Sequence, residues 1–190
     1  MAILTEVDFM RGITPGMILL LTTGLVAETP SGWVELKSKD GAVSFAMPIQ
    51  PTEKTTTQRI SGGPIEVLEY SCTSGGCLYR LEKSPMPIKI PEDRLAGALK
   101  AARDSIARKY EIQDEREATV AGWPALEFQI EAPLKAGAAP SKIRMLVFYA
   151  GDEFYQVRVF ALGPGREPRR FREFFDSVKP AEAMQSPSPR

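Results

Sequence analysis

Hydrophobic and polar residues alternate along several short stretches of the chain, which is the pattern of β-strands with one buried face. The turn signal Asp40-Gly41 comes directly before one such stretch, and a Thr-rich segment of extended propensity ends at Gly62-Gly63-Pro64. A later stretch places apolar residues on one face and Glu127, Gln129 and Glu131 on the other, which we expect to face water. The pattern predicts strands over residues 33–36, 43–47, 53–60 and 126–131.

Residues 66–83 predict a hairpin that specifies its own register. When Cys72 lies opposite Cys77 across the loop 73–76, like side chains and opposite charges meet across the strands. A slip by one residue would turn each set to the wrong face. Directly opposite residues lie within the span that a disulfide tolerates. The other pairs of this register are Tyr70–Tyr79, Leu68–Leu81, Glu66–Lys83 and, on the opposite face, Glu69–Arg80.

A second hairpin joins residues 143–150 to 153–162 at Gly151-Asp152, where glycine in the first loop position suits a type II′ turn. Its strands carry apolar residues on both faces, so we expect them at the centre of a covered sheet. Helical spacing of apolar residues predicts one helix after Pro91 and another near the C-terminus, anchored by Leu99 and Phe174. The two apolar stripes are Leu95, Leu99, Ala102, Ile106 and Tyr110, and Phe171, Phe174, Phe175 and Val178.

These elements predict an α+β fold in which helices flank an antiparallel β-sheet. At 190 residues the chain has room for one domain of ordinary size, which we place at 28–179. A loop rich in Ala, Gly and Pro is expected to be mobile over 133–142. The segment 180–190, rich in Pro and Ser, is expected to be a disordered tail.

The segment 13–27 is almost wholly uncharged, and its apolar centre is too short to span a membrane but suits a signal peptide. We expect cleavage after Ala27 and an exported protein, periplasmic or extracellular. Glu6 and Asp8 are unusual ahead of a signal core, so Met10 is the expected start of translation. Two alternatives remain open, namely an anchor that stays attached to the membrane and a buried N-terminal helix.

The chain has 24 basic and 24 acidic side chains and no histidine. Because the charge is balanced, no overall electrostatic field attracts nucleic acid, and a nucleic-acid partner is not expected. Contact with a membrane is expected only through an uncleaved N-terminal segment. The lack of histidine excludes Ser-His-Asp and Cys-His catalysis and histidine-containing zinc sites. No catalytic, metal-binding or cofactor motif is found, so no cofactor is expected.

The two cysteines, Cys72 and Cys77, are separated by four residues. Three interpretations are open for them: a redox pair, a metal site and a structural cross-strand disulfide. A four-thiolate metal site needs more cysteines than the chain has, and a redox pair is more usual as Cys-x-x-Cys at a helix start. The disulfide is the interpretation that suits an exported chain.

Two further features are candidates for binding. Arg166, Arg169, Arg170 and Arg172 form a basic cluster beside the last predicted helix. The cluster suits either an anionic polymer or phosphate group, or the solvated start of an amphipathic helix. Trp123 suits either an exposed ligand platform or packing at the edge of the sheet.

A set of turn and core residues occurs in a fixed order along the chain: Trp33, Asp40 to Phe45 closing at Pro48, Gly122-Trp123-Pro124 with Glu127, Phe154-Tyr155, and Phe171 to Val178. In this order the chain resembles the PsbP-like fold, named for an extrinsic photosystem II subunit and shared with a Ran-binding nuclear-transport factor and with exported bacterial proteins. The resemblance implies an α/β/α sandwich and a binding or accessory role rather than an enzyme.

These observations favour an exported, non-catalytic binding or accessory domain that docks a protein or a cell-envelope component. One alternative is a hydrolase that uses carboxylates or a serine without histidine. Asp114, Glu115 and Glu117 are available for this chemistry, although a surface acidic stretch is the simpler interpretation of them. The other alternative is a membrane-anchored accessory subunit that retains residues 13–27.

Overall fold

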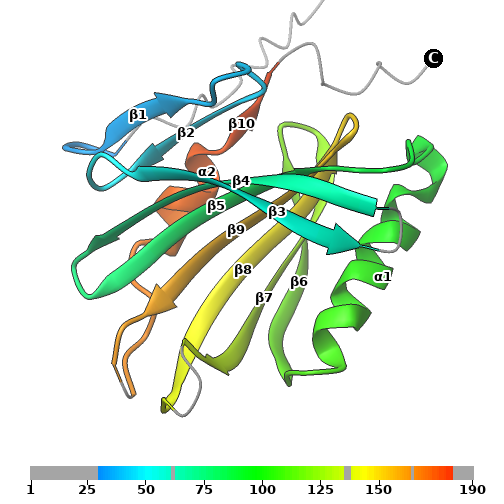
Figure 1. Ribbon diagram of the computed structural model, residues 1–190. Coiled ribbons are helices and arrows are strands. Elements are labelled where there is room, and N and C mark those ends of the chain that lie inside the picture. Colours follow the sequence, from blue (N-terminus) through cyan, green and yellow to red (C-terminus); the bar gives the residue numbers. More distant parts are fainter. Residues whose placement is uncertain (1–29, 61–62, 135–137, 164, 182–190) are drawn as a thin grey trace, which may run out of the picture.

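A computed structural model describes residues 30–60, 63–134, 138–163 and 165–181 (Figure 1). The predicted signal peptide over 1–27, its cleavage after Ala27 and the start at Met10 lie outside the described residues. Residues 182–190 of the predicted tail also lie outside them. In the described ranges, no helix is long and apolar enough to cross a membrane.

The described residues form an α+β fold with ten strands in two antiparallel sheets, which confirms the predicted fold class. The smaller sheet has the order β1-β2-β10 and contains β1 (Val34–Lys37), β2 (Val43–Met47) and β10 (Lys179–Pro180). The larger sheet has the order β3-β4-β5-β9-β8-β7-β6. Its strands are β3 (Thr52–Ile60), β4 (Gly63–Ser74), β5 (Cys77–Pro85), β6 (Ile112–Val120), β7 (Trp123–Pro133), β8 (Pro140–Ala150) and β9 (Glu153–Ala161).

The two helices pack on opposite faces of the seven-stranded sheet (Figure 1). Helix α1 (Leu95–Ala107) follows a 3-10 turn, Glu92–Arg94, and contacts β7 and β8. Helix α2 (Phe171–Ser177) contacts β2 and β9. Leu99 of α1 and Phe174 of α2 are both buried, so the predicted anchors of the two helices are confirmed.

Strands β8 and β9 lie at the centre of the sheet, as their apolar pattern predicts. Val147 on one face and Phe148 on the other are fully buried, because α1 covers one face and α2 with the small sheet covers the other. The connecting turn also agrees with the prediction. Gly151 has a φ of +60° and Asp152 does not have a positive φ, as a type II′ turn requires.

The register of the β4–β5 hairpin differs from the prediction by two residues. Cys77 pairs with Ser74, and Cys72 pairs with Tyr79. The reason is the turn: Gly75 and Gly76 have φ of +58° and +75°, which allows a two-residue type I′ turn in place of a four-residue loop. A shift by two keeps every side chain on its predicted face, so the faces are correct although the directly opposite partners are wrong. The predicted pairing of Glu69 with Arg80 is retained as a diagonal ion pair, with 3.5 Å between Arg80 Nε and Glu69 Oε1.

The structure does not contain the predicted disulfide, for the same reason. Both cysteines are buried free thiols. In this register they are diagonal neighbours, a spacing of about 7–8 Å between Cα atoms that exceeds the usual span of a disulfide. Cys77 Sγ instead accepts a hydrogen bond from the Arg169 backbone N–H, 3.4 Å away. Burial raises the pKa of the Cys72 thiol, which disfavours the reactive thiolate.

The face of β7 that was predicted to be exposed to solvent is buried at two of its three polar positions. Glu127 is 1% exposed and Gln129 is 5% exposed, while Glu131 is exposed. The Glu127 carboxylate is bound by Arg172 of α2 and Arg116 of β6, each at 2.8 Å. Burial raises the pKa of Glu127, and the attraction of Arg116 opposes this effect. Sequence alternation does not reveal such a covered carboxylate, because the arginines that bind it come from other elements.

Ordered structure extends into two segments that were predicted to lack it. Strand β7 continues to Pro133 and β8 begins at Pro140, so the predicted loop over 133–142 is shorter. Strand β10 continues to Pro180, one residue past the predicted end of the domain. At the edge of the small sheet a proline removes no interior ladder bond, and the next residue, Ala181, donates its N–H to the Ala42 carbonyl at 2.8 Å.

A buried lysine ties the two sheets together. Lys83 of β5 is 6% exposed and pairs with Asp40 in the β1–β2 turn and with Glu153 of β9, the latter at 3.3 Å. The sequence had predicted Glu66 as its partner, but Glu66 pairs with Thr57 of β3. The ammonium group thus holds a turn of the small sheet against two strands of the large one.

Candidate functional site

Strand β6 is one edge of the seven-stranded sheet, and a tight turn joins it to β7. Val120 pairs with Trp123, so the loop has two residues, Ala121 and Gly122. Their φ angles are +49° and +88°, the positive pair that a type I′ turn requires. This turn fixes which residues of β6 face α1 and which face α2.

A bulge interrupts β6 at its other end. The pairing with β7 shifts between Gln113 and Arg116, and Asp114 takes a φ of +49°. Asp114 forms an ion pair with Arg144 of β8 at 2.8 Å. Beyond the bulge, Arg116 turns to the α2 face and binds Glu127, while Glu115 and Glu117 line the side of α1. Glu115 and Glu117 therefore lie on the same side of the sheet as α1.

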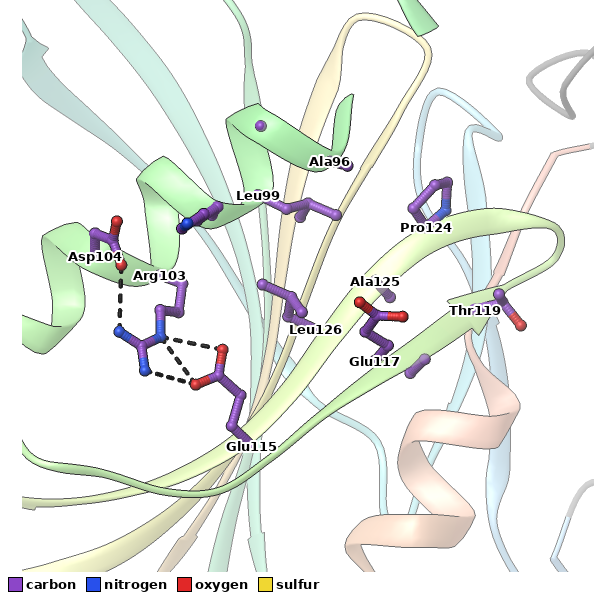
Figure 2. Close-up of a pocket in the computed structure, with 13 residues that line it drawn as sticks. Ala96, Leu99, Arg103, Asp104, Glu115, Glu117, Thr119, Pro124, Ala125 and Leu126 are labelled. Carbon is purple, nitrogen blue, oxygen red and sulfur yellow. Dashed lines mark hydrogen bonds and ion pairs between the residues drawn. The ribbon is translucent and has the colours of Figure 1, made fainter. Parts of the chain in front are cut away.

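An open groove of ≈ 1030 Å³ runs between α1 and strands β6 and β7 (Figure 2). Leu99 of the helix and Leu126 of β7 form an apolar floor together with Ala125 and Pro124. The groove exists because α1 rests on β7 and β8 and leaves the edge strand beside it uncovered. A concave apolar surface with a few polar groups at its rim is the usual form of a binding site.

One end of the groove is closed by ion pairs from the helix to the strand (Figure 2). Nε of Arg103 lies 3.1 and 3.0 Å from the two Glu115 oxygens, and its Nη2 lies 2.6 Å from Oε2. Asp104 binds the same guanidinium at 3.2 Å. The hydrogen bond to Glu115 raises the pKa of Arg103.

The two other charged side chains that line the groove, Lys100 and Glu117, differ from Arg103, Asp104 and Glu115. Lys100 on the helix rim and Glu117 on the strand rim are exposed, and neither has an ion-pair partner in the described part of the chain. Surface charges of this kind are free to pair with a ligand. The groove therefore offers an apolar floor with one unpaired charge of each sign.

The predicted binding residue Trp123 is not an exposed platform. It is 6% exposed and belongs to the core, so the packing interpretation is confirmed. Its Nε1 is buried without a hydrogen-bond partner among the described residues. The residue nevertheless matters for the groove, because its position after the two-residue turn aligns β7 with β6.

The predicted basic cluster is divided among several separate contacts. Arg166 packs along the Gly76 and Gly163 backbone, where an added Cβ would lie 2.7 and 3.3 Å from it. Arg169 anchors its segment through the backbone, accepting a hydrogen bond from the Tyr79 hydroxyl at 2.9 Å.

The two remaining arginines of the cluster also have protein partners. The Arg170 guanidinium lies over the Trp33 ring at 4.7 Å and contacts Glu173 at 3.2 Å. Arg172 points inward to Glu127. These contacts support a structural role for the cluster, since an anion would have to compete with partners already in place.

The structure places the three carboxylates that were considered for hydrolysis along the bulged part of β6. Asp114 and Glu115 are held by Arg144 and Arg103, and Glu117 alone has no ion-pair partner in the described ranges. Within those ranges, no group of three or more Asp, Glu or Cys side chains is placed to hold a metal ion. The groove itself was missed by the sequence analysis, because its helix and its edge strand meet only in the folded chain.

Neither a scan against protein-family models nor a search of curated proteins finds a match for this chain.

Proposed function

We propose that this chain is a non-catalytic binding domain whose recognition surface is the groove between α1 and β6. The observation that carries the proposal is the groove's composition, an apolar floor at Leu99 and Leu126 beside the unpaired charges of Lys100 and Glu117. A concave apolar surface with a few polar groups at its rim is the form that most ligand sites take. The arginine partners of Asp114 and Glu115 support binding rather than acid–base chemistry at this site.

Gly97 provides a direct test, because it lines the groove and an added Cβ would meet nothing within 4 Å. We expect fragments of a small-molecule library to shift the amide signals of groove residues in ¹⁵N NMR spectra. Gly97→Trp fills the groove and is expected to weaken such binding about tenfold or more. Gly97→Ala is the matched control, which keeps binding and raises helix stability by about 1 kcal/mol.

Two results would contradict the groove as the recognition surface. One is a set of bound fragments whose signals all map to other surfaces. The other is a Gly97→Trp variant that binds groove fragments with unchanged affinity. Thermal unfolding of both variants shows that the loss of binding is not a loss of fold.

We also propose that the domain is exported and that its fold is PsbP-like. The apolar segment 13–27 supports export, without any contribution from a disulfide. One helix on each face of an antiparallel sheet supports the sandwich. N-terminal sequencing of the protein recovered from its host should begin near Glu28. An intact Met1 on protein recovered from the cytoplasm contradicts the export.

A further inference from the structure

The free edge of β6 presents its backbone groups to the outside at defined residues. In a two-residue hairpin the flanking pair, Val120 and Trp123, exchanges both backbone hydrogen bonds, and the pairs alternate from there. Glu117 and Thr119 therefore belong to pairs that do not bond across the hairpin, so their N–H and C=O groups point away from β7. In the described part of the chain no further strand pairs with this edge.

The same two residues line the groove. Glu117 and Thr119 are exposed, and both line the groove (Figure 2). A chain that paired with their backbone would run along the groove. Because successive side chains of a strand point to opposite faces, every second side chain of such a chain would point toward the groove, beside Glu117 and Thr119.

The charges of the groove indicate what the added chain carries. Three carboxylates and two cations line the groove, and Arg103 is already neutralised by Glu115 and Asp104. The unpaired carboxylate, Glu117, lies directly on the pairing edge. A basic side chain beside it gains an ion pair at no cost to the existing ones.

We propose that the groove binds an extended peptide segment of a partner protein, which adds as a strand to the edge of β6. Backbone hydrogen bonds to Glu117 and Thr119 hold the segment. One of its apolar side chains enters the groove over Leu99, and one basic side chain pairs with Glu117. Edge-strand addition gives affinity through the main chain and specificity through alternate side-chain pockets. This inference rests on the proposed function, since it names the partner of the same groove.

A second copy of the chain fits the edge less well. Four residues of β6 line the groove, and by the alternation of the strand Glu115, Glu117 and Thr119 share the face toward α1 while Ala118 lies on the other face. If β6 of another molecule occupied the edge, it would place its own carboxylates beside Glu117 and no large apolar side chain over the floor. Like charges opposed across strands are destabilising. A peptide of different composition is therefore the favoured occupant.

The test selects peptides from a displayed random library on the full chain and then measures the affinity of each selected peptide for Gly97→Trp. A synthetic copy of the best peptide is then N-methylated at one amide at a time. Strand addition predicts an alternating pattern, in which every second N-methyl group weakens binding about tenfold or more and the others have little effect. A peptide held only through its side chains shows no such alternation, which overturns the inference.

Thr119 gives the complementary variant on the protein. Thr119→Pro removes an outward N–H without removing a bond to β7, and an edge strand tolerates proline there. It is expected to weaken peptide binding about tenfold, while Thr119→Val keeps the N–H and most of the affinity. Equal affinities of the two variants overturn strand addition, and the N-methyl pattern decides the question independently if Thr119→Pro does not fold.

The outcomes separate this inference from the proposed function. Peptides that bind, are blocked by Gly97→Trp and are indifferent to N-methylation leave the groove as the recognition surface and overturn strand addition. Peptides that bind Gly97→Trp with unchanged affinity contradict both. A dimer that Thr119→Pro converts to monomers shows a second copy on this edge and overturns the peptide inference.

Discussion

Replacing Phe174 by alanine is expected to lower the free energy of unfolding by about 3–5 kcal/mol, the largest effect of any single substitution considered for this chain. The Phe174 ring is fully buried, lies edge-on to Tyr79 at 5.7 Å between ring centroids, and contacts Phe175. Helix α2 has only seven residues and cannot be stable by itself, so it depends on this ring for its docking. Urea unfolding followed by circular dichroism measures the loss.

Phe171 is the matched control for this substitution. It begins the same helix but is only half-buried, and its ring lies under Arg144 and Arg172 at 5.1 Å in each case. Phe171→Ala is expected to cost clearly less than Phe174→Ala. A loss below about 1 kcal/mol for Phe174→Ala would show that α2 does not close the core on this face.

Replacing Lys83 by methionine is expected to cost about 3 kcal/mol, because it leaves the partly buried carboxylate of Glu153 without its cation. Adding Glu153→Gln to this variant removes the stranded charge and should recover part of the loss. Chemical denaturation of the single and double variants measures both effects. Lys100→Met, at an exposed position without an ion-pair partner in the described part of the chain, is the control and should stay within about 0.5 kcal/mol.

The effect of Lys83→Met should depend on pH in a stated direction. Burial raises the pKa of Asp40, but hydrogen bonds from Lys83, Ser38 and the Ala42 backbone outweigh it and lower the pKa to about 2 from 3.8. The stability that this pairing contributes is therefore complete above about pH 4 and is lost as the pH falls toward 2.

The pKa of Glu153 is shifted upward, whereas that of Asp40 is shifted downward. Burial raises its pKa and Lys83 opposes that rise, so the carboxyl of the variant should protonate more readily as the pH falls. Both effects narrow the difference in stability between wild type and Lys83→Met at low pH. A difference that stays constant from pH 7 to pH 3 would show that the lysine acts through its packing and not through its charge.

Several local features of the fold follow from the sequence alone. Apolar residues on both faces place β8 and β9 at the centre of the sheet, and the stripes of Leu99 and Phe174 identify the buried faces of the helices. These predictions succeed because they depend on the periodic spacing of apolar residues along the chain and on the conformational preference of turn residues such as Gly151. Both properties are carried by residues that are close together in the sequence.

The incorrect predictions have a common origin. In each case two structures fit the local sequence pattern equally well. The faces of the β4–β5 hairpin are as predicted but its register is not, because a shift of two residues preserves the alternation. Only the two glycines at positive φ, within a sheet that also pairs β5 with β9, select one register. The same holds for Glu127, whose pattern is that of a solvated face until Arg116 and Arg172 cover it.

The sequence by itself determined the fold class, the central strands, the two helix anchors and the exclusion of histidine chemistry. Tertiary structure alone decided the sheet order, the separation of Cys72 from Cys77, and the groove between α1 and β6. The physical reason is that an edge strand becomes an edge only when the order of all its neighbours is set. The outward backbone groups of Glu117 and Thr119, and the helix that leaves them uncovered, are properties of that order and not of any local pattern.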